Sequence, residues 1–152
     1  MLFFTGLART ASEIVPEQIK NIPSRESELN AMRAMVDEAI NVLNSETDLR
    51  EFGKLLHETW MLKKSLSSVI SSSTIDNIYD TARAAGAEGG KLLGAGSGGF
   101  VLFYVEPQHQ EKVRLALANL LHVPFRFDTA GSQVIYYSPS YKENFPRHVT
   151  EA

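Results

Sequence analysis

The pattern of apolar and polar positions predicts helices over much of the first half of the chain. Apolar residues recur at spacings of three and four, so that each segment has one apolar side. In residues 24–44 the apolar side consists of Leu29, Met32, Val36, Ala39, Ile40 and Leu43. In residues 48–65 it consists of Leu49, Phe52, Leu56 and Trp60. In the next helix, which ends at Gly86, it consists of Ile75, Ile78, Tyr79 and Ala82. A shorter helix is expected from Ser12 to Pro23, with Pro16 in its first turn.

Strands are predicted where β-branched and aromatic residues form unbroken or alternating runs. These are residues 2–5, 100–105, 123–128 and 133–137, with a further strand just before residue 94. A helix from Pro107 to about Leu121 precedes the last two strands, and residues 130–132 form the turn between those strands.

The order of these elements predicts an α+β domain with a mostly antiparallel sheet. It is close to a ferredoxin-like plait with extra helices inserted after the first strand, and residues 2–5 should pair with residues 100–105. The run 100–105 has no polar face. We therefore expect both sides of that strand to be covered, one by helices and the other by a partner.

The length of 152 residues suits one domain, which we place at residues 1–138. Residues 139–152 are polar and contain two prolines, so a loosely held tail is expected there. The first predicted strand begins next to Met1, which suggests that the chain was cut from something longer.

Composition excludes several classes of function. The net charge is −3 with 22% charged residues, which favours neither nucleic acid nor acidic membranes as partners. There are no cysteines, and the four histidines lack metal-ligand spacing, so we expect no metal site on this chain. No leader and no long apolar run is evident, so a soluble, cytoplasmic protein is expected, with a homo-oligomer left open.

The most unusual stretch is rich in glycine: seven of the ten glycines fall between Gly86 and Gly99. The spacing of Gly94, Gly96 and Gly99 fits the dinucleotide-binding fingerprint, but that fingerprint must open a helix and here a strand follows. A phosphate loop of the Walker type fails because Phe100 stands where lysine is required. Two interpretations stay open: converging backbone amides that hold an anion, or a crowded hairpin with a structural role.

Residues 91–100, Lys-Leu-Leu-Gly-Ala-Gly-Ser-Gly-Gly-Phe, resemble the third conserved motif of the GHMP small-molecule kinases. Residues 3–12 resemble the start of that family's C-terminal domain, and the resemblance extends from about Leu2 to Tyr137. Residues 52–60, 62–64 and 86–91 are most similar to the sugar kinases that act on D-glycero-D-manno-heptose 7-phosphate.

The resemblance implies transfer of the ATP γ-phosphate to a sugar hydroxyl, with the glycine-rich loop next to the active site. Candidate phosphate-side residues are Gly94, Ala95, Gly96, Ser97, Gly98 and Gly99. Candidate substrate contacts are Arg9, Trp60, Lys63, Lys64 and Lys91. For the lysine pair the alternative is a solvated basic end of the helix.

The family's ATP-binding phosphate loop, Mg²⁺ ligands and catalytic aspartate belong to an N-terminal domain, and no stretch of this sequence resembles them. The resemblance therefore implies no catalytic residue here, with ATP and Mg²⁺ used only by a complete enzyme. Two hypotheses follow. The chain is the substrate-side domain of a sugar-phosphate kinase, or it is an autonomous plait for small-molecule binding or oligomerisation without catalysis.

Overall fold

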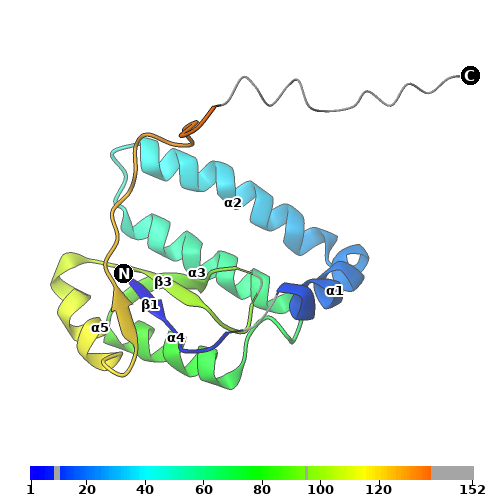
Figure 1. Cartoon of the computed structure of the whole chain (residues 1–152), viewed down its shortest axis with the longest axis horizontal. Helices are drawn as coiled ribbons and strands as arrows, with labels where there is room; N and C mark the ends of the chain where they lie inside the picture. Colours follow the sequence, from blue (N-terminus) through cyan, green and yellow to red (C-terminus); the bar gives the residue numbers. More distant parts are fainter. Residues whose placement is uncertain (9–10, 95, 138–152) are drawn as a thin grey trace, which may run out of the picture.

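The structure is a computed structural model that describes residues 1–8, 11–94 and 96–137. Four antiparallel strands form one sheet in the order β2-β3-β1-β4 (Figure 1). Helices α4 and α5 lie below this sheet in the view of Figure 1, and α3 and α2 lie above it. The elements are β1 (Leu2–Phe4), α1 (Ala11–Asn21), η1 (Ile22–Ser24), α2 (Glu26–Asn44), α3 (Arg50–Ser65), α4 (Ser73–Ala85), β2 (Ala87–Leu92), β3 (Phe100–Val105), η2 (Pro107–His109), α5 (Gln110–Ala116) and β4 (Leu121–Val123).

The strand order confirms the predicted α+β class and the ferredoxin-like plait with extra helices after the first strand. Phe3 in β1 pairs with Val101 in β3, as the sequence predicted. Successive side chains of a strand point to opposite faces, and here only one face is fully buried. Its members are Phe3, Val101, Phe103 and Val105, and the ring of Phe103 packs 5.8 Å from that of Tyr79 on α4.

The opposite face of the sheet is only partly covered, mainly by α3. This helix lies very close to β2, because two glycines meet there. A Cβ added to Gly89 would lie 1.8 Å from the carbonyl oxygen of Gly53. On this face of β3, Phe100 is exposed, and Leu102 and Tyr104, which lie beside α3, are half-buried. The expectation that the β3 strand has two apolar faces holds, but the described residues bury only one of them.

Several helical side chains are less buried than the periodicity predicts. Val36, Ile40 and Leu43 on α2 are half exposed or more, because α2 packs on α3 and overhangs the open face of the sheet. Leu49, just before α3, is exposed and Phe52 on α3 is half-buried, although both were expected to be buried; Leu55 and Trp60 on α3 are buried. Periodicity finds the apolar side of a helix but does not show how much of it a neighbour covers.

Two helix boundaries differ from the prediction. Pro16 is the sixth residue of α1 rather than a first-turn residue, because α1 begins at Ala11. Helix α5 ends at Ala116, not near Leu121. Leu121 instead begins β4 and pairs with Phe4, so strand pairing with β1 takes residues that helical periodicity had assigned to the helix.

The last two predicted strands are wrong in this structure. Only Leu121–Val123 forms a strand, and residues 124–137 are not assigned to any regular element. The predicted turn has Gly131 at a φ of +65°, but the strands on either side of it do not pair. The expected tail, residues 139–152, lies outside the described residues. Among the described helices, none is both long and apolar enough to cross a membrane.

Candidate functional site

The glycine loop, residues 94–99, joins β2 to β3 and is held from both sides. The amide of Ser97 donates to the carbonyl of Ile70 at 2.8 Å, in the segment between α3 and α4. The amide of Gly99 donates to the carbonyl of Leu7 at 2.8 Å, in the segment after β1. The loop is therefore packed between two backbone segments that are distant from it in sequence.

This packing explains why the loop needs glycine. A Cβ on Gly96, whose φ is +136°, would lie 2.9 Å from the carbonyl oxygen of Ile70, and one on Gly98 would lie 2.8 Å from that of Leu7. Ser97 adopts a φ of +57°, which is uncommon for a residue with a side chain. Its hydroxyl donates a hydrogen bond to the carbonyl of Val69, which holds this conformation in place.

The backbone amides of the loop fall into two groups. Those of Ser97 and Gly99 are already used by carbonyl groups of the chain. Those of Gly96 and Gly98 make no hydrogen bond within the described part of the chain. The amide of Gly94 makes none there either, and Gly94 is exposed whereas Gly96 and Gly98 are buried. The anion-holding interpretation of the loop therefore concerns Gly94, Gly96 and Gly98, and the structural one concerns Ser97 and Gly99. Ala95 lies outside the described residues.

Among the described residues, Lys63 is a cation in direct contact with the glycine loop. It lies in the last turn of α3, and its ammonium group donates to the carbonyl of Gly94 at 2.6 Å. Burial, followed by the positive charge of Lys91 nearby, lowers the pKa of Lys63. Lys91 is on β2, opposite Leu102 and thus on the open side of the sheet. Lys91 is therefore near enough to Lys63 for the two positive charges to interact.

Lys64 and Trp60 make contacts within the fold. Lys64 forms an ion pair of 2.9 Å with Asp76 on α4, and its ammonium lies 5.9 Å from the centre of the Trp60 ring. Trp60 is 0% exposed and sits in the core beside Tyr79. The expectation that these two side chains contact a substrate stays a prediction; in this structure Trp60 is enclosed in the core and Lys64 is paired with a carboxylate. Arg9 lies outside the described residues.

His57 on α3 has a partner on the neighbouring helix that the sequence does not indicate. Its Nδ1 lies 2.7 Å from the hydroxyl of Tyr79, which is buried. Burial raises the pKa of Tyr79 to about 12 and lowers that of His57. The contact links α3 to α4. Sequence distance hides it, because the two residues lie on different helices.

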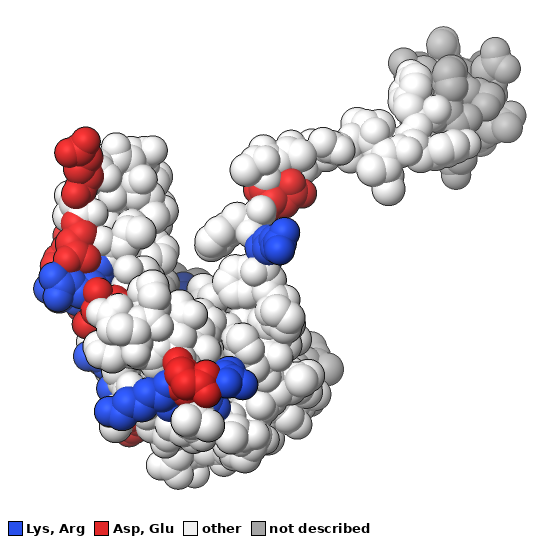
Figure 2. All heavy atoms as spheres, turned by 90° about the vertical axis from the view of Figure 1, so that its left-hand side faces the viewer, with Lys and Arg blue, Asp and Glu red and all other residues white. Residues whose placement is uncertain are grey.

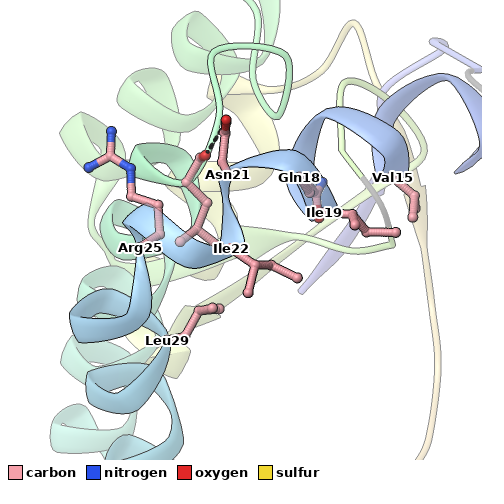
Figure 3. Close-up of a pocket in the computed structure, with 8 residues that line it drawn as sticks. Val15, Gln18, Ile19, Asn21, Ile22, Arg25 and Leu29 are labelled. Carbon is pink, nitrogen blue, oxygen red and sulfur yellow. Dashed lines mark hydrogen bonds between the residues drawn. The ribbon is translucent and has the colours of Figure 1, made fainter.

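Two apolar hollows lie along the helices. One, of about 150 Å³, is lined by α1, η1 and the start of α2. Figure 3 shows Val15, Ile19 and Ile22 beside it, with the guanidinium of Arg25 pointing away. The other, of about 230 Å³, lies between α2 and α3 and has Lys91 on its border. The second hollow therefore borders the candidate site.

Comparison with known proteins relates the chain to small-molecule kinases. It is 34% identical over 119 residues to D-glycero-alpha-D-manno-heptose 7-phosphate kinase of Campylobacter jejuni, covering 77% of this chain and 35% of that protein. It is 31% identical over 116 residues to mevalonate kinase of Pyrococcus horikoshii, covering 74% and 32%. The solved structure of L. major mevalonate kinase in complex with R-mevalonate shares the fold, with a TM-score of 0.66 at 22% identity over 78% of this chain and 37% of that one.

The chain spans about a third of the length of these relatives. Residues 31–123 match the model of the family described as GHMP kinases C terminal. That match covers more than half of the chain and includes the glycine loop, the strands β2 and β3 on either side of it and the segment with Ile70 that contacts it. The chain therefore belongs to the GHMP kinase family and corresponds to the C-terminal domain of its members.

Proposed function

We propose that residues 1–138 are the substrate-side domain of an ATP-dependent kinase acting on D-glycero-D-manno-heptose 7-phosphate. The complete enzyme would transfer the ATP γ-phosphate to a hydroxyl of the sugar. The observation that carries this proposal is the 34% identity to the C. jejuni heptose 7-phosphate kinase over 77% of the chain. The mevalonate kinases match at somewhat lower identity over a similar share of the chain, so they provide the competing substrate class.

The geometry of the site supports a role in positioning phosphate. Phosphoryl transfer depends mainly on positioning and on stabilisation of charge. In our proposal the amides of Gly96 and Gly98 and the ammonium groups of Lys63 and Lys91 face the phosphate groups. Partial burial of Lys63 strengthens its attraction for an anion, because the surroundings screen its charge less than water does. Arg9 stays in the proposed set on the basis of sequence alone.

ATP and Mg²⁺ belong to the proposed complete enzyme. Among the described residues, no three His, Cys, Asp or Glu side chains are grouped so that they could hold a metal ion. This part of the chain therefore does not fit a Mg²⁺ site, and we assign no step through the metal to it. We expect no tight nucleotide binding by residues 1–152 alone.

The test joins an N-terminal ATP-binding domain of the family to this chain and measures ADP release with three acceptors. Release with heptose 7-phosphate, and not with mevalonate or L-fucose, is the expected result. ADP release with mevalonate alone would support the kinase function but overturn the assignment of heptose 7-phosphate as its substrate. A correctly folded fusion without turnover on any acceptor would favour the autonomous binding domain.

A further inference from the structure

The C-terminal segment, residues 124–137, carries apolar side chains that the described domain leaves in water. Phe127 is 91% exposed and Ile135 is 96% exposed. Val134, Tyr136 and Tyr137 are also mostly exposed. Monomeric proteins rarely leave contiguous apolar groups uncovered, and such groups usually mark an interaction surface. We therefore expect another protein surface to cover this segment.

Residues 133–137, Gln-Val-Ile-Tyr-Tyr, have the composition of a β-strand. Four of the five are β-branched or aromatic, and none is charged or proline. Natural sheets protect exposed edges with charges or proline, and this stretch has neither. An extended segment of this kind adds readily to the edge of a sheet, because its backbone amides and carbonyls then pair.

The beginning of the segment borders an apolar hollow of about 180 Å³. Phe125 and Phe127 line it together with Phe52 of α3 and Tyr104 of β3. Phe52 also lines the hollow between α2 and α3, so the two hollows share a wall. Figure 2 shows the result as a largely uncharged hollow between the ridge formed by α2 and the projecting C-terminal segment.

Three occupants compete for this surface: a hairpin within the segment, a second copy of the chain, or another domain of the same kinase. The hairpin is not formed, since residues 124–128 and 133–137 are unpaired in the described chain. A second copy seated here would also cover Lys91, which borders the shared hollow and belongs to the proposed substrate site. The third occupant is favoured, because about two thirds of the C. jejuni relative lies outside the match, which is enough for a further domain on the same polypeptide.

We propose that residues 133–137 form a strand that adds to a sheet edge in the N-terminal ATP-binding domain, and that this domain covers the adjoining apolar hollow. The segment then ties the two domains together across the substrate site. This inference rests on the proposed function, because it requires a kinase domain on the same polypeptide.

Hydrogen exchange measured by mass spectrometry tests the strand. In the fusion of the ATP-binding domain with residues 1–152, amides of residues 133–137 should exchange about 100-fold more slowly than in the 152-residue chain alone. Equal protection in both proteins would overturn the proposal in favour of an internal hairpin. Protection that rises with protein concentration in the isolated chain would overturn it in favour of a second copy.

A pair of variants in the fusion makes the test specific. Ile135→Pro removes a backbone donor and should abolish the protection of residues 133–137, whereas Ile135→Val should retain it. Peptides from residues 100–105 report whether the domain itself remains folded in both variants. Retained protection in a folded Ile135→Pro protein would contradict the strand.

Activity separates this inference from the proposed function. Protection of residues 133–137 in a fusion that lacks turnover would support the strand while the heptose kinase assignment fails. Turnover with heptose 7-phosphate in a fusion whose segment is unprotected would support the kinase and overturn the strand.

Discussion

Lys63 and Lys64 are adjacent in the sequence, but their ammonium groups reach different parts of the molecule. Lys63 contacts the glycine loop at Gly94, and Lys64 pairs with Asp76 on the neighbouring helix. The sequence alone treated them as one basic pair at the end of a helix. Residues next to each other on a helix point about 100° apart, so adjacency in sequence does not imply a shared site.

The first prediction separates these two lysines in the complete kinase. Lys63→Ala should raise KM for the phosphorylated sugar more than tenfold and more than KM for ATP, because one charge-assisted contact contributes roughly 1.5–3 kcal/mol. Lys64→Ala is the matched control, and it should lower stability by no more than about 1 kcal/mol without changing KM. Steady-state kinetics for both substrates provide the measurement. An unchanged sugar-phosphate KM in Lys63→Ala would favour the alternative interpretation, in which Lys63 only forms a solvated basic end of the helix.

The second prediction concerns the pH dependence of stability. Burial lowers the pKa of His57 below its usual value of 6.5, so at mildly acidic pH the unfolded chain binds more protons than the folded one. The contribution of His57 to stability is complete above pH 6.5 and is lost as the pH falls below that value toward the folded pKa. Urea unfolding across this range should show the loss.

The control for that experiment is His57→Gln. Its amide oxygen offers the Tyr79 hydroxyl an acceptor but does not titrate. The variant should lose the part of the pH dependence that arises between neutral and mildly acidic pH. If the wild-type and variant pH profiles were parallel, other groups would account for the effect.

At the scale of elements, the contact between α3 and β2 determines where the candidate site lies. The close approach of Gly53 and Gly89 fixes α3 against the edge of the sheet. Because α3 runs on from Gly53 to Lys63, this contact sets the position of the lysine beside the glycine loop. The sequence showed both glycines but gave no reason to connect them, since one lies in a helix and the other in a strand.

The third prediction tests this contact in the 152-residue chain. Gly89→Ala would place a Cβ 1.8 Å from the carbonyl oxygen of Gly53, so helix and strand must separate. We expect the free energy of unfolding to fall by about 1–3 kcal/mol in urea titration. Gly131→Asn is the control, with open space around its Cβ and a φ that asparagine tolerates, and it should stay within about 0.5 kcal/mol. A Gly89→Ala protein as stable as the wild type would contradict the close packing.

At the scale of the whole molecule, the chain has one well-covered face and one open one. Helices α4 and α5 close one side of the sheet, while the other side carries the apolar hollows and the exposed C-terminal segment. The candidate lysines and the glycine loop lie next to the open side. A partner that covers this side would therefore also enclose the proposed substrate site.

The fourth prediction is that residues 1–152 alone do not consume ATP in a sugar-dependent manner. Holding two reactants in line accounts for about 7–11 kcal/mol of a barrier, and the described chain offers no group of metal ligands to hold ATP·Mg²⁺. A coupled ADP-release assay with heptose 7-phosphate on the isolated chain, with the fusion as positive control, provides the test. Robust turnover by the isolated chain would contradict the proposal that it is only the substrate-side domain of a kinase.

The sequence by itself determined the class of fold, the helices α2 to α4, the pairing of β1 with β3 and the family. These depend on local periodicity and on a contiguous glycine motif, which can be read without knowing what packs where. The helix end at Gly86 was predicted in the same way, because a left-handed residue after the helix requires glycine locally.

Only the tertiary structure decided which candidate residues come together. Trp60 lies in the core, and the side chains of Lys63 and Lys64 have different partners. Helix α5 ends early because the residues after it form β4, which pairs with β1. It also left residues 133–137 unpaired despite their strand-like sequence. The physical reason is common to these cases: burial and strand pairing depend on groups that are distant in sequence, and local pattern shows what a residue can do but not which partner it meets.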